Sequence, residues 1–312
     1  MIVQELNSIQ ERCGYLPEEE LTALARRIEV PLYRLHEVAS FFPHYHLARP
    51  RAAHVKVCRD MACHLRGSEK LLRRLEAHAG ELGEERIEVG GVSCLGQCDN
   101  APALLINERV YWGLNEPDLR ARVRLAAAGE PLPRQHADRS PLGWAIDPYQ
   151  GQPRYEAVRK LVATHDADAV LEALKTAELR GMGGAGFPTW RKWTAVRNEP
   201  AREKYVVANG DESEPGTFKD RELLRRAPHL VIEGVVLAGL VTGATHGYIY
   251  IRHEFEEEIE AVQAAIAEAA RQGACGERIL GTERSFPVEV FVSPGGYICG
   301  EESALLEAME DR

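Results

Sequence analysis

Apolar positions recur at helical spacing in the first part of the chain. Pro17 precedes three glutamates, Leu21 and Leu24 follow three positions apart, and Pro31 opens a second stretch of the same kind. Proline suits the first turn of a helix, and acidic side chains near the N-terminus interact favourably with the helix dipole. The pattern therefore predicts short amphipathic helices over residues 1–50 that pack on their neighbours.

Strand-like alternation replaces the helical spacing after residue 53. Polar and apolar side chains alternate over residues 54–57 and lead directly into Cys58. Further along, the pattern predicts a helix capped by Ser68, a strand over 87–89, a hairpin of 103–106 with 110–112, and a helix over 117–127. This order is typical of a small thioredoxin-like α/β domain, which we assign to residues 51–128.

A segment rich in turn-forming residues follows this domain. Five prolines and three glycines fall within residues 129–153, which indicates a linker. Beyond it, the pattern predicts a helix over 167–178, a buried strand over 204–208 and a later strand over 288–292. We assign residues 154–312 to a second, larger α/β domain, so the fold class is α/β throughout.

Composition narrows the range of partners. The 312 residues carry 38 Lys+Arg and 48 Asp+Glu, a formal net charge of −10, which gives no general attraction to nucleic acid or anionic lipid. The most apolar stretch, residues 230–241, is too short to span a bilayer and contains Glu233. The first fifteen residues lack the apolar core of a signal peptide. We expect a cytoplasmic protein without direct membrane insertion.

The seven cysteines indicate a metal centre. Cys58 and Cys63 form one pair and Cys94 and Cys98 a second, whereas the other three are isolated and predicted to be buried apolar residues. Soft thiolate ligands select zinc or an iron–sulfur cluster. The pairs are more widely spaced than in most zinc knuckles, which favours two sulfide-bridged irons. Zinc and unliganded thiols remain the alternatives.

A glycine-rich loop precedes a predicted helix in the second domain. Residues 180–189 contain four glycines in six positions, with Arg180, Arg191 and Lys192 nearby. Free backbone N–H groups at a helix N-terminus suit a phosphate. The alternative is a flexible turn without a ligand.

Two further loops follow predicted strands. Residues 209–221 are rich in acidic side chains, and residues 294–304 combine glycines with the neighbouring carboxylates Glu301 and Glu302. Ligands commonly bind at the carboxyl ends of strands in α/β sheets. Asp220 and Arg221 have an alternative role in capping the next helix. Three such loops on one sheet edge indicate a nucleotide or flavin site.

These motifs together resemble a known family. Residues 180–188, 209–221 and 297–303 resemble the FMN and NADH motifs of the flavoprotein subunit of NADH dehydrogenases, the 51-kDa subunit of complex I. The cysteine pairs resemble the [2Fe-2S] domain of its 24-kDa partner subunit. The combination in one chain is similar to diaphorase subunits of soluble formate dehydrogenases and NAD-reducing hydrogenases. The glycine loop and the linker sequence 144–149 are closest to the formate dehydrogenase group.

The resemblance implies roles for individual residues. Cys58, Cys63, Cys94 and Cys98 would bind a [2Fe-2S] cluster. The phosphate and ribityl region of FMN would contact Gly181, Gly183, Gly184 and Lys192. The flavin would contact Asn209, Asp211, Glu212, Tyr297, Gly300 and Glu301. The residues facing NAD(H) would be Phe187, Glu214 and Glu302.

The resemblance also implies an activity. Hydride would pass between NAD(H) and FMN, and single electrons between the flavin and iron–sulfur centres. The partners would be other subunits of a redox complex, such as a molybdopterin formate dehydrogenase or a hydrogenase large subunit. The family continues beyond the glutamate pair, so we expect an incomplete flavoprotein subunit, with any [4Fe-4S] cluster supplied elsewhere. The alternatives are a non-enzymatic [2Fe-2S] carrier or docking subunit, and a zinc-stabilised binding module.

Overall fold

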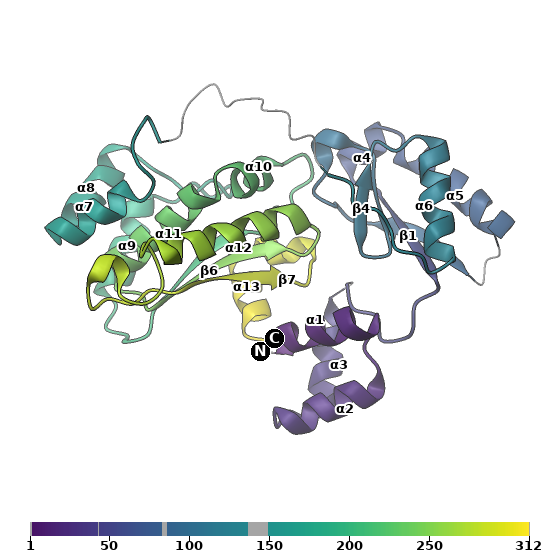
Figure 1. Cartoon of the computed structure of the whole chain (residues 1–312), viewed down its shortest axis with the longest axis horizontal. Coiled ribbons are helices and arrows are strands. Elements are labelled where there is room, and N and C mark those ends of the chain that lie inside the picture. Colours follow the sequence, from purple (N-terminus) through teal and green to yellow (C-terminus); the bar gives the residue numbers. More distant parts are fainter. Residues whose placement is uncertain (1, 43, 83–85, 137–148, 312) are drawn as a thin grey trace.

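The computed structural model describes residues 2–42, 44–82, 86–136 and 149–311. The chain begins with three helices, α1 (Ile2–Cys13), α2 (Glu18–Arg27) and α3 (Leu32–Phe41), drawn in purple in Figure 1. Pro17 and Pro31 immediately precede α2 and α3, which confirms the predicted helix starts. Each helix buries one apolar face, as amphipathic helices do.

The next part of the chain forms a four-stranded sheet. In chain order its elements are β1 (Ala53–Cys58), α4 (Met61–Leu65), α5 (Ser68–Leu82), β2 (Ile87–Val92), η1 (Cys98–Asn100), β3 (Ala103–Ile106), β4 (Arg109–Trp112) and α6 (Glu116–Ala127). The strand order is β2-β1-β3-β4, with β1 parallel to β2 and the other pairs antiparallel. Apolar residues of β1, β3, α5 and α6 form a core of their own. The strand, helix, strand, hairpin and helix predicted from the sequence are all present, and α4 is an addition.

The last part of the chain surrounds a three-stranded sheet. In chain order its elements are α7 (Glu156–Thr164), α8 (Ala167–Thr176), α9 (Thr189–Asn198), β5 (Tyr205–Gly210), α10 (Lys219–Arg226), α11 (Pro228–Thr242), β6 (His246–Arg252), α12 (Glu256–Arg271), η2 (Ile279–Gly281), β7 (Val288–Ser293), η3 (Tyr297–Gly300) and α13 (Glu302–Met309). The strands are parallel in the order β5-β6-β7. Helices α11 and α12 share a core with β6 and β7.

One expectation about this sheet was wrong. Strand β5 lies at the edge of the described sheet and is only half-buried, and its first residue Tyr205 is 54% exposed, so it is not a buried strand. The glycine-rich loop lies between two helices, as predicted: it joins α8 to α9 and is closed by a bridge between Arg180 and Pro188.

The N-terminal helices pack on the last part of the chain. Their apolar faces share one core with Tyr250 of β6, Phe291 of β7 and Leu305 of α13. The backbone N–H of Val3 also donates to a carboxylate oxygen of Asp311 at 2.9 Å. Figure 1 accordingly shows both chain ends beside one another. The prediction that these helices pack on neighbours is confirmed.

Residues 137–148 of the predicted linker lie outside the described residues. Pro141, Gly143, Pro148 and most of the 144–149 sequence fall in that gap. Among the residues that are described, no helix combines the length and apolar composition needed to cross a membrane.

Candidate functional site

The four paired cysteines come together where strands of the first sheet end. Cys58 is the last residue of β1, Cys63 lies in α4, Cys94 follows β2, and Cys98 begins η1. The Sγ atoms of Cys94 and Cys98 are 3.3 Å apart, and the thiol of Cys58 lies within hydrogen-bonding reach of both Cys63 and Cys94. Cys58, Cys63 and Cys94 are buried, whereas Cys98 is partly exposed.

Backbone N–H groups are directed at three of these sulfurs. Gly96 donates to Cys94 at 3.4 Å, Ala103 donates to Cys63 at 3.4 Å, and Gly216 donates to Cys98 at 3.2 Å. Hydrogen bonds of this kind stabilise thiolates and tune the potential of iron–sulfur clusters. The thiol donor set and its N–H partners therefore suit a cluster.

The spacing of the sulfurs distinguishes a two-iron cluster from zinc. In a tetrahedral zinc site with Zn–S bonds of about 2.3 Å, all four sulfurs lie about 3.8 Å from one another. Among the described residues, the groups with three ligand atoms within 4.8 Å of one another consist of histidine and glutamate and include no thiol. Among the described residues, no three of the cysteine sulfurs therefore lie as close together as the ligands of a single tetrahedral zinc ion.

The thiol pKa values follow from burial and from the contacts between the sulfurs. The hydrogen bond with Cys63 and burial raise the pKa of Cys58 to about 11, and burial raises that of Cys98 to about 11. The same contact with Cys58 lowers the pKa of Cys63. Cys58 and Cys98 are therefore protonated near neutral pH unless a metal displaces their protons.

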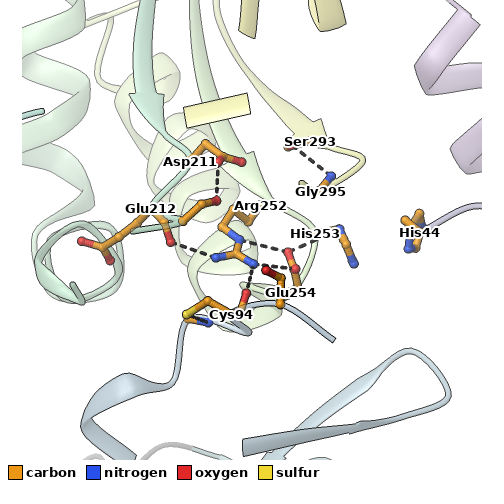
Figure 2. A network of polar contacts seen from close by, with 12 residues as sticks. His44, Cys94, Asp211, Glu212, Arg252, His253, Glu254, Ser293 and Gly295 are labelled. Carbon is orange, nitrogen blue, oxygen red and sulfur yellow. Dashed lines mark hydrogen bonds and ion pairs between the residues drawn. The ribbon is translucent and has the colours of Figure 1, made fainter. Parts of the chain in front are cut away.

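Two buried arginines near the three-stranded sheet contact the loop of residues 94–99, which we call the cysteine loop. Figure 2 shows Arg252, at the end of β6, donating to the carbonyl oxygens of Cys94 and Glu212 and pairing with Glu254. Arg221 of α10 donates to the Gly96 carbonyl oxygen at 2.7 Å and binds both carboxylate oxygens of Asp99 at 2.7 Å. The cysteine loop is therefore fixed against the second sheet.

The acidic loop begins at the carboxyl end of β5. The side-chain amide of Asn209 donates to the Gly300 carbonyl oxygen at 2.9 Å, which joins this loop to η3. Asp211 is buried and accepts a hydrogen bond from Ser213, and burial raises its pKa to about 6. The carboxylate of Glu212 accepts from the backbone N–H groups of Asp220 and Arg221 at 2.8 and 3.1 Å. Glu212 thus caps α10.

The other predicted site residues lie at the surface around this loop. The Tyr297 hydroxyl donates to Glu214 at 2.6 Å, and Lys192 of α9 pairs with Glu302 at 3.3 Å. Glu301 accepts from the backbone N–H groups of Ser303 and Ala304, so it caps α13. These contacts join η3 to the acidic loop and α9 to the start of α13.

The glycine loop leaves space for a ligand. Phe187 is 50% exposed, and a Cβ added to Gly183 or Gly184 would meet no atom within 4 Å. Gly181 instead lies against the carbonyl oxygen of Phe187. An exposed glycine backbone beside Lys192 suits a phosphate, so these residues fit the phosphate end of a flavin nucleotide.

Sequence reasoning missed three residues of this region. Arg252 and Gly216 were not identified, and Arg221 was considered only as a helix cap, although both arginines contact the cysteine loop. The available signal for Arg252 was the charged triplet Arg252–Glu254 directly after an apolar strand, since charges at a strand end are seldom buried without a partner.

Comparison with protein families identifies two regions. Residues 1–125 match the family described as thioredoxin-like [2Fe-2S] ferredoxin. Residues 174–312 match the family described as the Nuo51 FMN-binding domain.

Individual proteins resemble one or both regions. An NADH-quinone oxidoreductase subunit of Rhizobium meliloti is 42% identical over 59% of this chain and 43% of that protein. The alpha subunit of the NAD-reducing hydrogenase HoxS of Cupriavidus necator is 28% identical over 100% of this chain and 55% of that protein. The crystal structure of an NAD+-reducing [NiFe]-hydrogenase in the air-oxidized state superimposes with a TM-score of 0.80 and 30% identity, covering 99% of this chain and 54% of that one. The chain thus spans about half the length of these relatives.

Proposed function

We propose, from the match of residues 1–125 to the thioredoxin-like [2Fe-2S] ferredoxin family and of residues 174–312 to the Nuo51 FMN-binding domain, that the chain is an NAD(H)-linked electron-transfer subunit of the diaphorase type. FMN, when bound, supplies the exchange of a two-electron hydride for single electrons, which a [2Fe-2S] cluster accepts one at a time. The protein binds, positions and electrostatically tunes these groups.

The acidic loop carries the proposal. One end of it, at Asn209, is hydrogen-bonded to Gly300 in the proposed flavin pocket. Further along the same loop, the N–H of Gly216 donates to the proposed cluster ligand Cys98 at 3.2 Å. One short loop therefore contacts both proposed cofactor sites, which supports electron transfer between them.

The arginines support the same proposal by fixing the two sites relative to one another. Arg252 contacts the Cys94 carbonyl oxygen on one side and the acidic loop at Glu212 on the other. Both arginine side chains are at least 96% buried. Buried, fully hydrogen-bonded guanidinium groups hold a fixed geometry. A fixed separation suits electron transfer, whose rate depends on distance.

We infer the partners and substrate roles from the relatives. The relatives are named as subunits of an NADH-quinone oxidoreductase and an NAD-reducing hydrogenase, so we propose that this chain also works within a multi-subunit redox complex. In the proposed site, Phe187, Glu214 and Glu302 face NAD(H). A formate dehydrogenase partner and a cytoplasmic location stay predictions from the sequence.

Anaerobically purified, cofactor-reconstituted protein tests the function. We expect flavin absorption that bleaches when NADH is added, followed by the paramagnetic signal of a reduced [2Fe-2S] cluster. The variant Cys58→Ser should keep flavin bleaching and lose the cluster signal. The matched control Cys275→Ser, a buried cysteine outside the paired set, should keep both.

The spectra also separate the alternatives. Cluster absorption without bound flavin would overturn the enzymatic proposal and favour a [2Fe-2S] carrier or docking subunit. Retention of zinc by the four paired cysteines, without iron or sulfide, would favour a zinc-stabilised module.

A further inference from the structure

Four histidines surround one carboxylate at the junction of the three parts of the chain. His44 and His46 follow α3, His54 lies at the start of β1, and His253 follows β6. The carboxylate belongs to Glu108, in the turn between β3 and β4. Potential ligand atoms of His46, His54 and Glu108 all lie within 4.8 Å of one another. The same is true of His44, His253 and Glu108.

The nitrogen–oxygen distances are long for charge-assisted hydrogen bonds and are compatible with two ligands of one metal ion. The Nε2 atoms of His46 and His54 lie 3.4 and 3.6 Å from the same oxygen of Glu108. Charge-assisted N–H···O bonds are about 2.7–2.9 Å long. Ligands bound to one tetrahedral ion at about 2.0–2.1 Å lie about 3.3 Å from each other. Both nitrogen–oxygen distances are therefore close to the distance between two ligands of one tetrahedral ion, and all three atoms lie within 4.8 Å of one another.

The backbone around His44 and His46 is held so that both rings reach the same place. The Gln10 side chain donates to the His44 carbonyl oxygen at 2.7 Å and accepts from the His46 N–H at 2.8 Å. Tyr45, between them, turns into the core and donates to the Val3 carbonyl oxygen at 3.0 Å. Gln10 and Tyr45 therefore fix the backbone that carries the two histidines.

The other ligands are also fixed by backbone contacts. The His54 N–H donates to the side chain of Asn107 at 3.0 Å, and the Asn107 N–H donates to the His54 carbonyl oxygen at 2.8 Å. This pair of bonds sets the turn that carries Glu108 beside the start of β1. The His54 side chain is only 6% exposed.

A cavity opens beside the cluster. It has a volume of about 80 Å³ and is lined by His44, His46, His54, Glu108 and His253 together with Lys56. The Glu108 side chain is 47% exposed, so the cluster is accessible from solvent. Figure 2 shows His44 and His253 facing one another, and their ring centroids are 4.1 Å apart.

We propose that His46, His54 and Glu108 bind a divalent first-row transition metal, for which Zn²⁺ is the appropriate probe. Two imidazoles and one carboxylate form a common ligand set for such ions, with a remaining position for water. His44 lies 3.3 Å from the other oxygen of Glu108 and orients the carboxylate. Cys94 also lines the cavity, but the proposed ligands include none of the paired cysteines, and the proposal does not depend on the proposed function.

The proposed metal would cross-link parts of the chain that are distant in sequence. His46 belongs to the segment after the N-terminal helices, and His54 and Glu108 belong to the first sheet. Since His44 contacts both Glu108 and His253 of the second sheet, an ion here stabilises the arrangement of all three parts.

X-ray absorption at the zinc edge tests the proposal on the full chain with its iron–sulfur cluster in place. After addition of one equivalent of ZnCl2 and dialysis, we expect one retained zinc with nitrogen and oxygen neighbours at about 2.0–2.1 Å. A sulfur shell at about 2.3 Å would place the zinc on cysteines and overturn the proposal. Loss of all zinc on dialysis would overturn it as well.

Variants locate the ion. Glu108→Gln and His54→Ala should each weaken zinc binding at least about 100-fold, because even changes outside the ligand set cost 10- to 100-fold in affinity. His36→Ala removes a histidine whose Nε2 lies 3.1 Å from Glu18 on the N-terminal helices, and should leave binding unchanged. Unchanged affinity in the well-folded Glu108→Gln protein would contradict the proposal. Should His54→Ala not fold, the absorption spectrum of the unmodified protein decides.

Discussion

Buried charges near the cysteine loop are stabilised by specific partners. Burial alone raises the pKa of Glu254, but the adjacent Arg252 guanidinium outweighs it and lowers the value to about 2. The pair is therefore charged at all physiological pH values. A buried arginine without such partners would be strongly destabilising, which explains why Arg252 contacts two carbonyl oxygens as well as Glu254.

Glu258 of α12 lacks an equally strong partner. It is 5% exposed, and burial raises its pKa from 4.5 to about 7, against the opposing influence of Arg221 and Arg225. Its charged form is thus disfavoured in the folded state. The resulting decrease in the free energy of unfolding is absent below pH 4.5, grows between pH 4.5 and 7, and reaches its full size above pH 7.

We therefore predict that Glu258→Gln stabilises the protein in a pH-dependent way. The free energy of unfolding of the variant should exceed that of the unmodified chain by a small amount at pH 5 and by at most about 3 kcal/mol at pH 8. Urea unfolding at a series of pH values measures it. Glu283→Gln, at a side chain 94% exposed, is the control and should show no such trend. Parallel stability curves for Glu258→Gln and the unmodified protein would contradict the assignment.

At the residue scale, the sequence predicted which cysteines would come together, and the structure brings these four near one another. The four cysteines were identified because thiols at close spacing carry their own chemical signal. The contacts of Arg221 and Arg252 with the cysteine loop were not predicted. Their partners include the backbone carbonyl oxygens of Gly96, Cys94 and Glu212, and a backbone group has no sequence signature. The histidine cluster around Glu108 was not predicted either, because its residues come from segments that are distant in the sequence.

At the scale of elements, helix α11 explains the most apolar stretch of the sequence. Residues 230–241 lie within this helix, which packs against α12 and all three strands of the second sheet. Two of its glycines differ sharply in surroundings. A Cβ on Gly239 would lie 2.3 Å from the ring of Phe286, whereas one on Gly234 would meet nothing within 4 Å.

These glycines give a matched pair of predictions. Gly234→Ala should stabilise the protein by about 0.5–1 kcal/mol, because alanine favours helix more than glycine. Gly239→Ala should destabilise it by about 1–3 kcal/mol, because the methyl group displaces the Phe286 ring. Denaturant unfolding of both variants measures the difference. Equal stabilisation by the two substitutions would show that Phe286 does not pack against α11.

Sequence patterns predicted long elements better than short or edge ones. Helix α5 spans fifteen residues, enough for its apolar period to be visible, whereas α4 has only five. Strand β5 has an apolar sequence and was expected to be buried, but its position at the sheet edge leaves it half exposed. Edge position depends on strand order, which a single segment does not encode.

At the scale of the whole molecule, the three parts do not pack in chain order. The N-terminal helices share their core with β6, β7 and α13, while the intervening four-stranded sheet has a separate core. Sequence analysis predicted that the helices pack on neighbours, but not which ones, because an amphipathic face specifies burial and not the identity of the covering surface.

The separate cores predict which strands lose stability when a core residue is mutated. Leu6 and Leu75 are both at least 97% buried, in the first and second of these cores respectively. Each change to alanine should cost about 2–5 kcal/mol. In Leu6→Ala, amide hydrogen exchange should accelerate mainly in β6 and β7, although these strands are far from Leu6 in sequence. In Leu75→Ala it should accelerate in β1 and β2 instead. Faster exchange confined to α1–α3 in Leu6→Ala would contradict the shared core.

The shared core also constrains how the protein is made on the ribosome. The helices that end at Phe41 are synthesised first, yet Phe291 and Leu305, which complete their core, are synthesised about 250 residues later. At about 5–20 residues per second, translation of that interval takes roughly 12–50 seconds. Throughout that time the nascent helices lack the part of their core that β6, β7 and α13 supply. Cellular folding of this chain therefore depends on what shields the first helices until the last strand emerges.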